Sequence, residues 1–278
     1  MSTGSGGRVT ANWGHGLLAA GGYRLEYACW GPPPSAAPSL VMLHEGLGCV
    51  ALWRDTPERL AAATGFGVVA YSRAGYGQSD SVTLPRPLDY MTREAVEVLP
   101  EVIEALGLDD FVLVGHSDGA TIAAEYAGRV ATPGLRGLVL IAPHFFTEEM
   151  GLAEIAAARR AYVTSELRGR MAKYHRDPDN AFFGWNDAWL ADGFKAWTVA
   201  DVIDAWAVPC LAIQGSADQY GTLRQVREIE ARSPASTEVR VIDGAHHAPH
   251  LEQADKVIGA VAGFCADVAD GMIPAADE

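Results

Sequence analysis

The fold is decided by the stretch FVLVGHSDGA, which occupies residues 111–120. Its first four residues are apolar, as in a buried strand, and the run ATIAAEYA at 120–127 is compatible with a helix. Gly115 and Gly119 bracket Ser117 on a turn that is too tight for most side chains. Strand, turn and helix in this order predict a nucleophile elbow, in which Ser117 Oγ is held at the edge of a sheet in a strained conformation.

Short apolar runs on both sides of this stretch predict further strands. They lie at 40–43, 68–71, 138–141, 210–214 and 239–242. Helical patterns alternate with them at 56–63, 92–106, 222–231 and 251–266, where Thr92 is a candidate cap and Gly107 closes the second helix. This alternation predicts an α/β fold with a mostly parallel sheet covered on both faces. Two short β-like runs around Gly21 and Gly22 predict an antiparallel hairpin ahead of it.

The regular alternation fails between His144 and about Ala200, where the pattern is helical and rich in aromatic residues. We therefore expect a core domain formed by residues 1–143 and 201–278, with a helical cap at 144–200 inserted over Ser117. Residues 1–10 and 271–278 are expected to be disordered.

Composition limits the possible partners. The chain has 278 residues, 49% of them apolar, and a net charge of −14. The charge argues against nucleic acids and anionic membrane surfaces as partners, and no apolar run approaches the ~20 residues that span a bilayer. The four cysteines are scattered, and no Cys or His pair has ligand spacing that is backed by a partner motif. With a start that does not read as a signal peptide, this pattern predicts a cytoplasmic protein with reduced thiols and no metal.

A serine nucleophile needs a base within hydrogen-bond reach and an acid that orients the base. Both should lie at the carboxyl ends of later strands, because Ser117 is presented at that edge. The strand at 210–214 leads into GSAD, which ends at Asp218, and the last strand leads into DGAHHAPH at 243–250. The acid is therefore expected to be Asp218, with the base in the 243–250 loop. The order Ser, Asp, His is that of α/β hydrolases.

The chain resembles the α/β-hydrolase superfamily from Leu17 to Ala266. The resemblance is carried by the elbow at 115–119, the acid turn at 215–218 and the motif GAHHAPHLE at 244–252. It implies an α/β-hydrolase fold and a serine hydrolase activity that needs no cofactor.

The last motif of the family usually reads Gly-x-Gly-His-x-Pro-His-Leu-Glu. Laid on this sequence, it places the base on His247, and His246 replaces the second glycine. His246 and His250 are the alternatives for the base, and we interpret them as polar residues of the loop and of the helix start. Asp243 is the alternative acid, and we interpret it as a turn former.

Acyl transfer also needs hydrogen-bond donors for the developing oxyanion. One donor is expected to be the backbone N–H of Asp118, whose carboxylate can turn toward the free N–H groups of the helix start. The second is expected from the HEGL loop at 44–47, from Gly46 or alternatively from Leu47. His44 and His116 adjoin these loops and are interpreted as structural.

Arg73, in the loop that follows the strand at 68–71, is interpreted as loop architecture. Arg54 is interpreted as a surface residue rather than as a ligand for a substrate carboxylate.

The cap should supply apolar residues to the substrate pocket. The candidate lining is the segment 182–189, in which Trp185 is the predicted pocket residue, together with Leu47, His144 and Tyr220. The expected function is hydrolysis of a small or medium organic ester, lactone or amide through an acyl-enzyme on Ser117. C–C bond cleavage of a ring-fission product and cofactor-free perhydrolysis use the same triad and stay open. A binding protein without catalysis is the alternative from another class.

Overall fold

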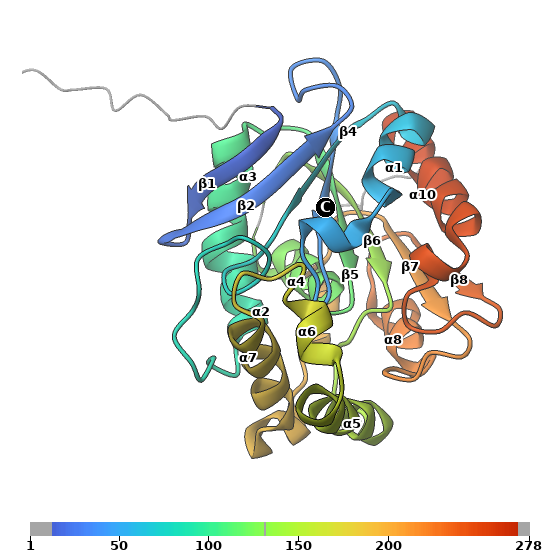
Figure 1. Ribbon diagram of the computed structural model, residues 1–278. Coiled ribbons are helices and arrows are strands. Elements are labelled where there is room, and N and C mark those ends of the chain that lie inside the picture. The colour runs from blue at the N-terminus through green and yellow to red at the C-terminus, as the bar shows by residue number, and fades with distance from the viewer. Residues whose placement is uncertain (1–12, 131, 272–278) are drawn as a thin grey trace, which may run out of the picture.

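The computed structural model describes residues 13–130 and 132–271 (Figure 1). At its centre is an eight-stranded sheet with the order β1-β2-β4-β3-β5-β6-β7-β8. The strands are β1 (His15–Ala20), β2 (Tyr23–Trp30), β3 (Ser39–Leu43), β4 (Gly67–Tyr71), β5 (Phe111–His116), β6 (Leu135–Ile141), β7 (Cys210–Gly215) and β8 (Thr237–Ile242). The pairings β1–β2 and β2–β4 are antiparallel, and all others are parallel. The predicted parallel sheet with an N-terminal hairpin is therefore confirmed.

Helices cover both faces of this sheet. In chain order the helices are α1 (Thr56–Thr64), α2 (Tyr90–Arg93), α3 (Leu99–Leu106), α4 (Asp118–Arg129), α5 (Glu149–Thr164), α6 (Leu167–Met171), α7 (Pro178–Leu190), α8 (Arg224–Arg232), α9 (Pro249–Glu252) and α10 (Ala254–Ala269). Those that pack on the sheet include α1, α3, α4, α8 and α10. A π-helical turn at Glu94–Val98 joins α2 to α3, and short 3₁₀ turns lie at Val50–Trp53, Asp192–Ala196 and Ala200–Ala205.

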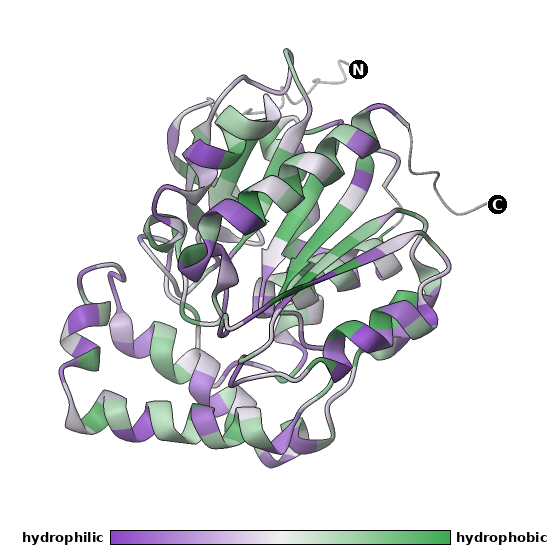
Figure 2. Ribbon diagram, turned by 90° about the vertical axis from the view of Figure 1, so that its right-hand side faces the viewer, coloured by the Kyte–Doolittle hydropathy of each residue, from purple (hydrophilic) through white to green (hydrophobic). Residues whose placement is uncertain are grey.

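The alternation of side chains along each strand creates two hydrophobic cores. In β3, Leu40 and Met42 belong to the core under α1 and α10, while Val41 and Leu43 belong to the core under α3 and α4. Helices α1 and α10 pack against each other on their face (Figure 1). The central strands are predominantly green in Figure 2, whereas the surrounding helices alternate between green and purple. Burial on both faces explains why these strands read as continuous apolar runs.

The helix predicted at 92–106 begins earlier than expected. Thr92 lies inside α2, and its hydroxyl donates to Glu125 Oε2 at 2.7 Å instead of capping a helix. The capping prediction is wrong because a buried carboxylate offers Thr92 a tertiary partner. Gly107 ends α3 with φ 64° and closes the helix as predicted. The predicted helix at 251–266 is divided at Gln253, whose φ is −133°, into α9 and α10.

The connection between β6 and β7 holds α5, α6 and α7, which we call the inserted helices. They lie together at the bottom of Figure 1. Some of their aromatic residues pack on one another: Tyr162 stacks on Phe182 with ring centroids 3.9 Å apart, and Phe183 meets Tyr162 edge-on. Of the residues expected to be disordered, 1–10 and 272–278 lie outside the described residues. In the described part of the chain, no helix is long and apolar enough to cross a membrane.

Candidate active site

Ser117 lies on the turn between β5 and α4, with φ 53° and ψ −118°. A positive φ is costly for a residue with a side chain, and it is characteristic of functional turns. The two flanking glycines leave no room for a Cβ atom. A Cβ on Gly115 would lie 2.3 Å from Gly119 O, and one on Gly119 would lie 1.9 Å from Leu43 O. The sequence GHSDG thus lets the elbow pack directly against the end of β3.

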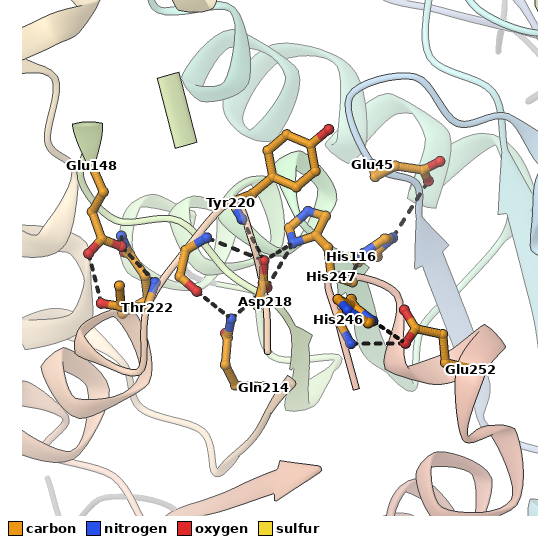
Figure 3. Close-up of polar contacts among 12 residues, drawn as sticks. Glu45, His116, Glu148, Gln214, Asp218, Tyr220, Thr222, His246, His247 and Glu252 are labelled. Carbon is orange, nitrogen blue, oxygen red and sulfur yellow. Dashed lines mark hydrogen bonds and ion pairs between the residues drawn. The ribbon is translucent and has the colours of Figure 1, made fainter. Parts of the chain in front are cut away.

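Asp218 and His247 come together from two different strand ends, after β7 and after β8 (Figure 3). His247 Nδ1 lies 3.0 Å from Asp218 Oδ1 and 2.8 Å from Oδ2. An ionised carboxylate only accepts hydrogen bonds, so Nδ1 carries the proton and Nε2 is the basic nitrogen of the neutral ring. The two predicted partners of Ser117 therefore form an acid–imidazole pair.

The Asp218 carboxylate is held from several sides. It accepts hydrogen bonds from Gln214 Nε2 at 2.6 Å and from the backbone N–H of Tyr220 at 2.8 Å and Gly221 at 3.3 Å (Figure 3). Burial of Asp218 opposes its ionisation, but the hydrogen bond and the charge of His247, with the Tyr220 amide, hold the pKa of Asp218 below its ordinary value. Asp218 is thus fixed as an anion that orients His247.

The alternative bases, His246 and His250, and the alternative acid, Asp243, contact other residues. His246 is paired with Glu252 Oε2 at 3.1 Å (Figure 3), and His250 is buried with its ring 5.2 Å from that of Trp53. Asp243 Oδ1 accepts a hydrogen bond from Ser216 Oγ at 3.2 Å in the turn after β8.

Ser117 and His247 open into a cavity of about 320 Å³. Its described lining comprises Glu45, Gly46, Leu47, His116, Ser117, Asp118, His144, Glu148, Gly151, Ile155, Trp185, Trp189, Gln219, Tyr220, His247, Ala248 and Glu252. The predicted pocket residues Leu47, His144, Trp185 and Tyr220 all lie in this wall.

Trp189 lies in the predicted lining segment 182–189 and reaches the cavity, whereas sequence reasoning did not single out Ile155 as a pocket residue. Trp189 follows Trp185 by four positions in α7, and this spacing places both on one helix face. Ile155 comes from α5, in which no pattern separates the pocket side from the other sides. Phe182 and Phe183, in the predicted lining segment, pack on Tyr162 instead.

The charges around the cavity are one-sided. Glu45, Asp118, Glu148 and Glu252 line it, whereas the described lining includes no lysine or arginine. Arg54 does not belong to the lining.

Three of these carboxylates have protein donors, and the donor to Asp118 is the hydroxyl of Tyr90. Glu148 accepts hydrogen bonds from Thr222 N, Thr222 Oγ1 and Gln225 Nε2 (Figure 3 draws the Thr222 bonds), and Glu252 accepts from His246 N.

His116 joins the loop of Glu45 to the loop of His247. Its Nε2–H donates to His247 O at 2.8 Å, and its Nδ1 lies 3.7 Å from Glu45 Oε2 (Figure 3). Burial opposes ionisation of Glu45, but His116 outweighs it and holds the pKa of Glu45 well below its usual range. Burial and the nearby His247 lower the pKa of His144 to about 3, so that His144 stays neutral at physiological pH.

Gly46, Leu47 and Asp118 reach the same cavity as Ser117. Within the described residues, no acceptor is found for the backbone N–H groups of these three residues. The expected direction of the Asp118 carboxylate is wrong. It does not bond to the helix N–H groups but accepts a hydrogen bond from Tyr90 Oη at 2.5 Å, because Asp118 is buried beside that tyrosine.

All four cysteines are free thiols, and burial raises their pKa values; that of Cys29 rises to about 11 and that of Cys49 to about 12. In the described ranges, no group of three or more His, Cys, Asp or Glu residues is arranged to hold a metal ion.

Residues 40–260 match the model of the Alpha/beta hydrolase family. A non-heme haloperoxidase of Rhodococcus erythropolis is 26% identical over 275 residues, which cover 87% of this chain and 95% of that protein. Other curated relatives are matched over as little as 31% of their own length.

Two solved structures show the same fold. The crystal structure of VinJ superposes with a TM-score of 0.74 at 23% identity, covering 91% of this chain and 98% of VinJ. A structure from work on carboxylesterases of the Thaumarchaeon Nitrososphaera gargenis superposes with a TM-score of 0.72 at 21% identity, covering 92% and 99% of the two chains.

Proposed function

The chain belongs to the alpha/beta hydrolase family of enzymes, and we propose that it is a serine hydrolase that cleaves a small or medium ester, lactone or amide with a neutral acyl part. One observation carries the proposal. His247, paired with Asp218 at 3.0 and 2.8 Å, lines the same cavity as Ser117, which is held on a strained turn. An oriented imidazole beside a serine on a nucleophile elbow is the machinery of acyl transfer.

The reaction begins when Ser117 Oγ attacks the substrate carbonyl and His247 Nε2 takes its proton. The N–H groups of Asp118 and of Gly46 or Leu47 donate to the oxyanion that forms. His247 then protonates the leaving group, which departs and leaves an acyl-enzyme on Ser117. Water, activated by His247, attacks this ester and releases the acid, so that the cycle uses only protein groups and water. Asp218 stays ionised throughout and stabilises the imidazolium.

The inserted helices act as a cap over this machinery, because Gly151 and Ile155 of α5 and Trp185 and Trp189 of α7 supply part of the cavity wall. A cavity of about 320 Å³ with two indole rings accommodates a compact organic group. The one-sided charge supports a neutral or cationic substrate. An anionic ring-fission dienoate would meet Glu45, Glu148 and Glu252 and, among the described lining residues, no arginine or lysine, whereas Asp118 is paired with the buried Arg73.

Cofactor-free perhydrolysis is the second candidate, favoured by the relative named non-heme haloperoxidase, which the match covers over 95% of its length. In that reaction hydrogen peroxide replaces water and converts the acyl group into a peracid. A peracid assay with acetate or a short ester and peroxide separates it from simple hydrolysis. The free, scattered cysteines support a cytoplasmic location.

The test is a turnover screen over p-nitrophenyl esters of increasing acyl length, lactones and ring-fission dienoates, combined with a fluorophosphonate label. We expect turnover of neutral esters, stoichiometric labelling at Ser117, and loss of both in Ser117→Ala. Full turnover in Ser117→Ala would refute the serine mechanism. Wild-type protein that binds esters but neither turns them over nor reacts with the label would favour the non-catalytic binding protein.

A further inference from the structure

Arg73 is a buried guanidinium next to the candidate site. It lies in the loop after β4 and is 2% exposed. A guanidinium keeps its charge in proteins, and a buried charge is tolerated only where partners surround it. Burial opposes the charged form, but Tyr76, Asp118 and Glu94 outweigh burial and hold the pKa of Arg73 above its ordinary value. The partners of the Arg73 side chain therefore show which segments it connects.

The first set of partners belongs to the loop that carries Gly46. Arg73 Nη1 donates to His44 O, and Arg73 Nη2 donates to Glu45 O at 3.1 Å. The Arg73 backbone N–H also donates to His44 Nε2 at 3.0 Å, which leaves the proton of His44 on Nδ1, where it donates to Glu45 O at 2.7 Å. Burial and the charge of Arg73 lower the pKa of His44, so the His44 ring stays neutral. Both carbonyls that precede Gly46 are thus fixed by one residue.

The second partner is on the other side of the site. Arg73 Nη2 lies 3.8 Å from Asp118 Oδ2, which also accepts the Tyr90 hydroxyl at 2.5 Å. Tyr90 Oη accepts in turn a hydrogen bond from Trp189 Nε1 at 3.0 Å. Trp189, which lines the cavity, is therefore linked to the Asp118 carboxylate through Tyr90. Burial raises the pKa of Asp118, and the charge of Arg73 opposes this rise.

We propose that Arg73 is a positioning residue for catalysis, which sets the distance between the two halves of the oxyanion site. The inference rests on the proposed function, because it concerns the amides of Gly46 or Leu47 and of Asp118. One guanidinium reaches the carbonyls on one side and the carboxylate on the other through a planar fork. A lysine has a single nitrogen and cannot reproduce this fork, so the loop of Gly46 loses its fixed place relative to α4.

The test compares Arg73→Lys with the wild type and with Arg136→Lys, whose arginine pairs with the exposed Asp110 away from the cavity. We expect kcat for a p-nitrophenyl ester to fall about 100-fold in Arg73→Lys, the lower end of the loss for one oxyanion donor, with KM within twofold. Affinity for a boronic acid that mimics the tetrahedral intermediate should fall by a similar factor. Arg136→Lys should match the wild type.

Hydrogen exchange gives a readout that does not depend on activity. The amides of residues 44–48 should exchange at least tenfold faster in Arg73→Lys than in the wild type and in Arg136→Lys. If Arg73→Lys does not fold, Asp118→Asn serves instead. It keeps the backbone donor, removes the charge that faces Arg73, and should lower kcat about tenfold with unchanged KM.

Unchanged kcat and unchanged exchange in a folded variant would overturn the role of Arg73. An inactive wild type whose exchange still depends on Arg73 would instead refute the hydrolase and leave the positioning of the loop supported.

Discussion

Replacing Asp218 by asparagine is the sharpest perturbation of the candidate site, because every group around this carboxylate is a donor. Oδ1 faces the amides of Tyr220 and Gly221, and Oδ2 faces Gln214 Nε2, while both oxygens meet His247 Nδ1. Asparagine has one oxygen and one NH₂. With its oxygen kept toward the two backbone amides, its NH₂ points at His247 Nδ1.

The ring must then accept at Nδ1 and carry its proton on Nε2, where a base is needed. An Asp-to-Asn change that imposes the wrong tautomer costs about 10⁴-fold in kcat in a serine protease. We expect a loss of about 10³- to 10⁴-fold here, which corresponds to roughly 4–5.5 kcal/mol in the barrier. KM should change little, since Asp218 is not part of the cavity lining.

The assay is steady-state hydrolysis of the best p-nitrophenyl ester, with the rate of fluorophosphonate labelling as a second readout. Asp243→Asn is the matched control, since Asp243 lies in the turn after the neighbouring strand β8 and bonds Ser216 rather than a histidine. Its kcat should stay within twofold of the wild type. A kcat for Asp218→Asn within tenfold of the wild type, in a folded protein, would refute the tautomer argument.

Three further predictions concern stability and the shape of the cavity. The pKa of His144 is lowered to about 3, so the unfolded chain binds its proton first as pH falls below about 6.5, and stability declines. His144→Gln should therefore remove about 2 kcal/mol of the stability loss between pH 6.5 and 4.5, measured by urea unfolding at both pH values. In Gly46→Ala the new Cβ would lie 2.2 Å from Trp185 Nε1, so kcat should fall about 100-fold, as for loss of an oxyanion donor. Adding Trp185→Ala should recover part of the lost kcat, and no recovery would contradict the steric cause. In Gly119→Ala the Cβ would lie 1.9 Å from Leu43 O, and because backbone cannot move aside as a side chain does, we expect at least about 3 kcal/mol of destabilisation, seen as a lower Tm or insoluble protein.

The sheet and the meeting of Asp218 with His247 could be predicted because both follow from local signals. Apolar runs mark the buried strands, and parallel strands bring their carboxyl ends to one edge, so residues just after β7 and β8 come together. The elbow at Ser117 was visible for a similar reason, since two glycines at fixed spacing specify a turn before any tertiary contact is known.

The features that escaped prediction depend on tertiary partners. The helix-end preference of Asp118 gave way to Tyr90, and the capping preference of Thr92 gave way to Glu125, because a buried polar group takes the partner that the fold brings to it. The sequence around Arg73 indicates only loop architecture. Its partners lie in the loop after β3 and on α4, and no pattern near Arg73 reveals these contacts.

The inserted helices also separate bond cleavage from substrate selection, because different parts of the chain supply the residues for each. The groups proposed to break the bond stand on loops tied to the sheet, whereas Ile155 and Trp185 shape the cavity from helices that carry aromatic packing of their own. Substitutions at Ile155 can therefore explore new substrates while the reacting groups keep their geometry, whereas the indole of Trp185 also packs on Gly46. Trp189 is likewise constrained, because its indole N–H is bonded to Tyr90. A library directed at substrate range should vary Ile155 freely and leave Trp185 and Trp189 in place.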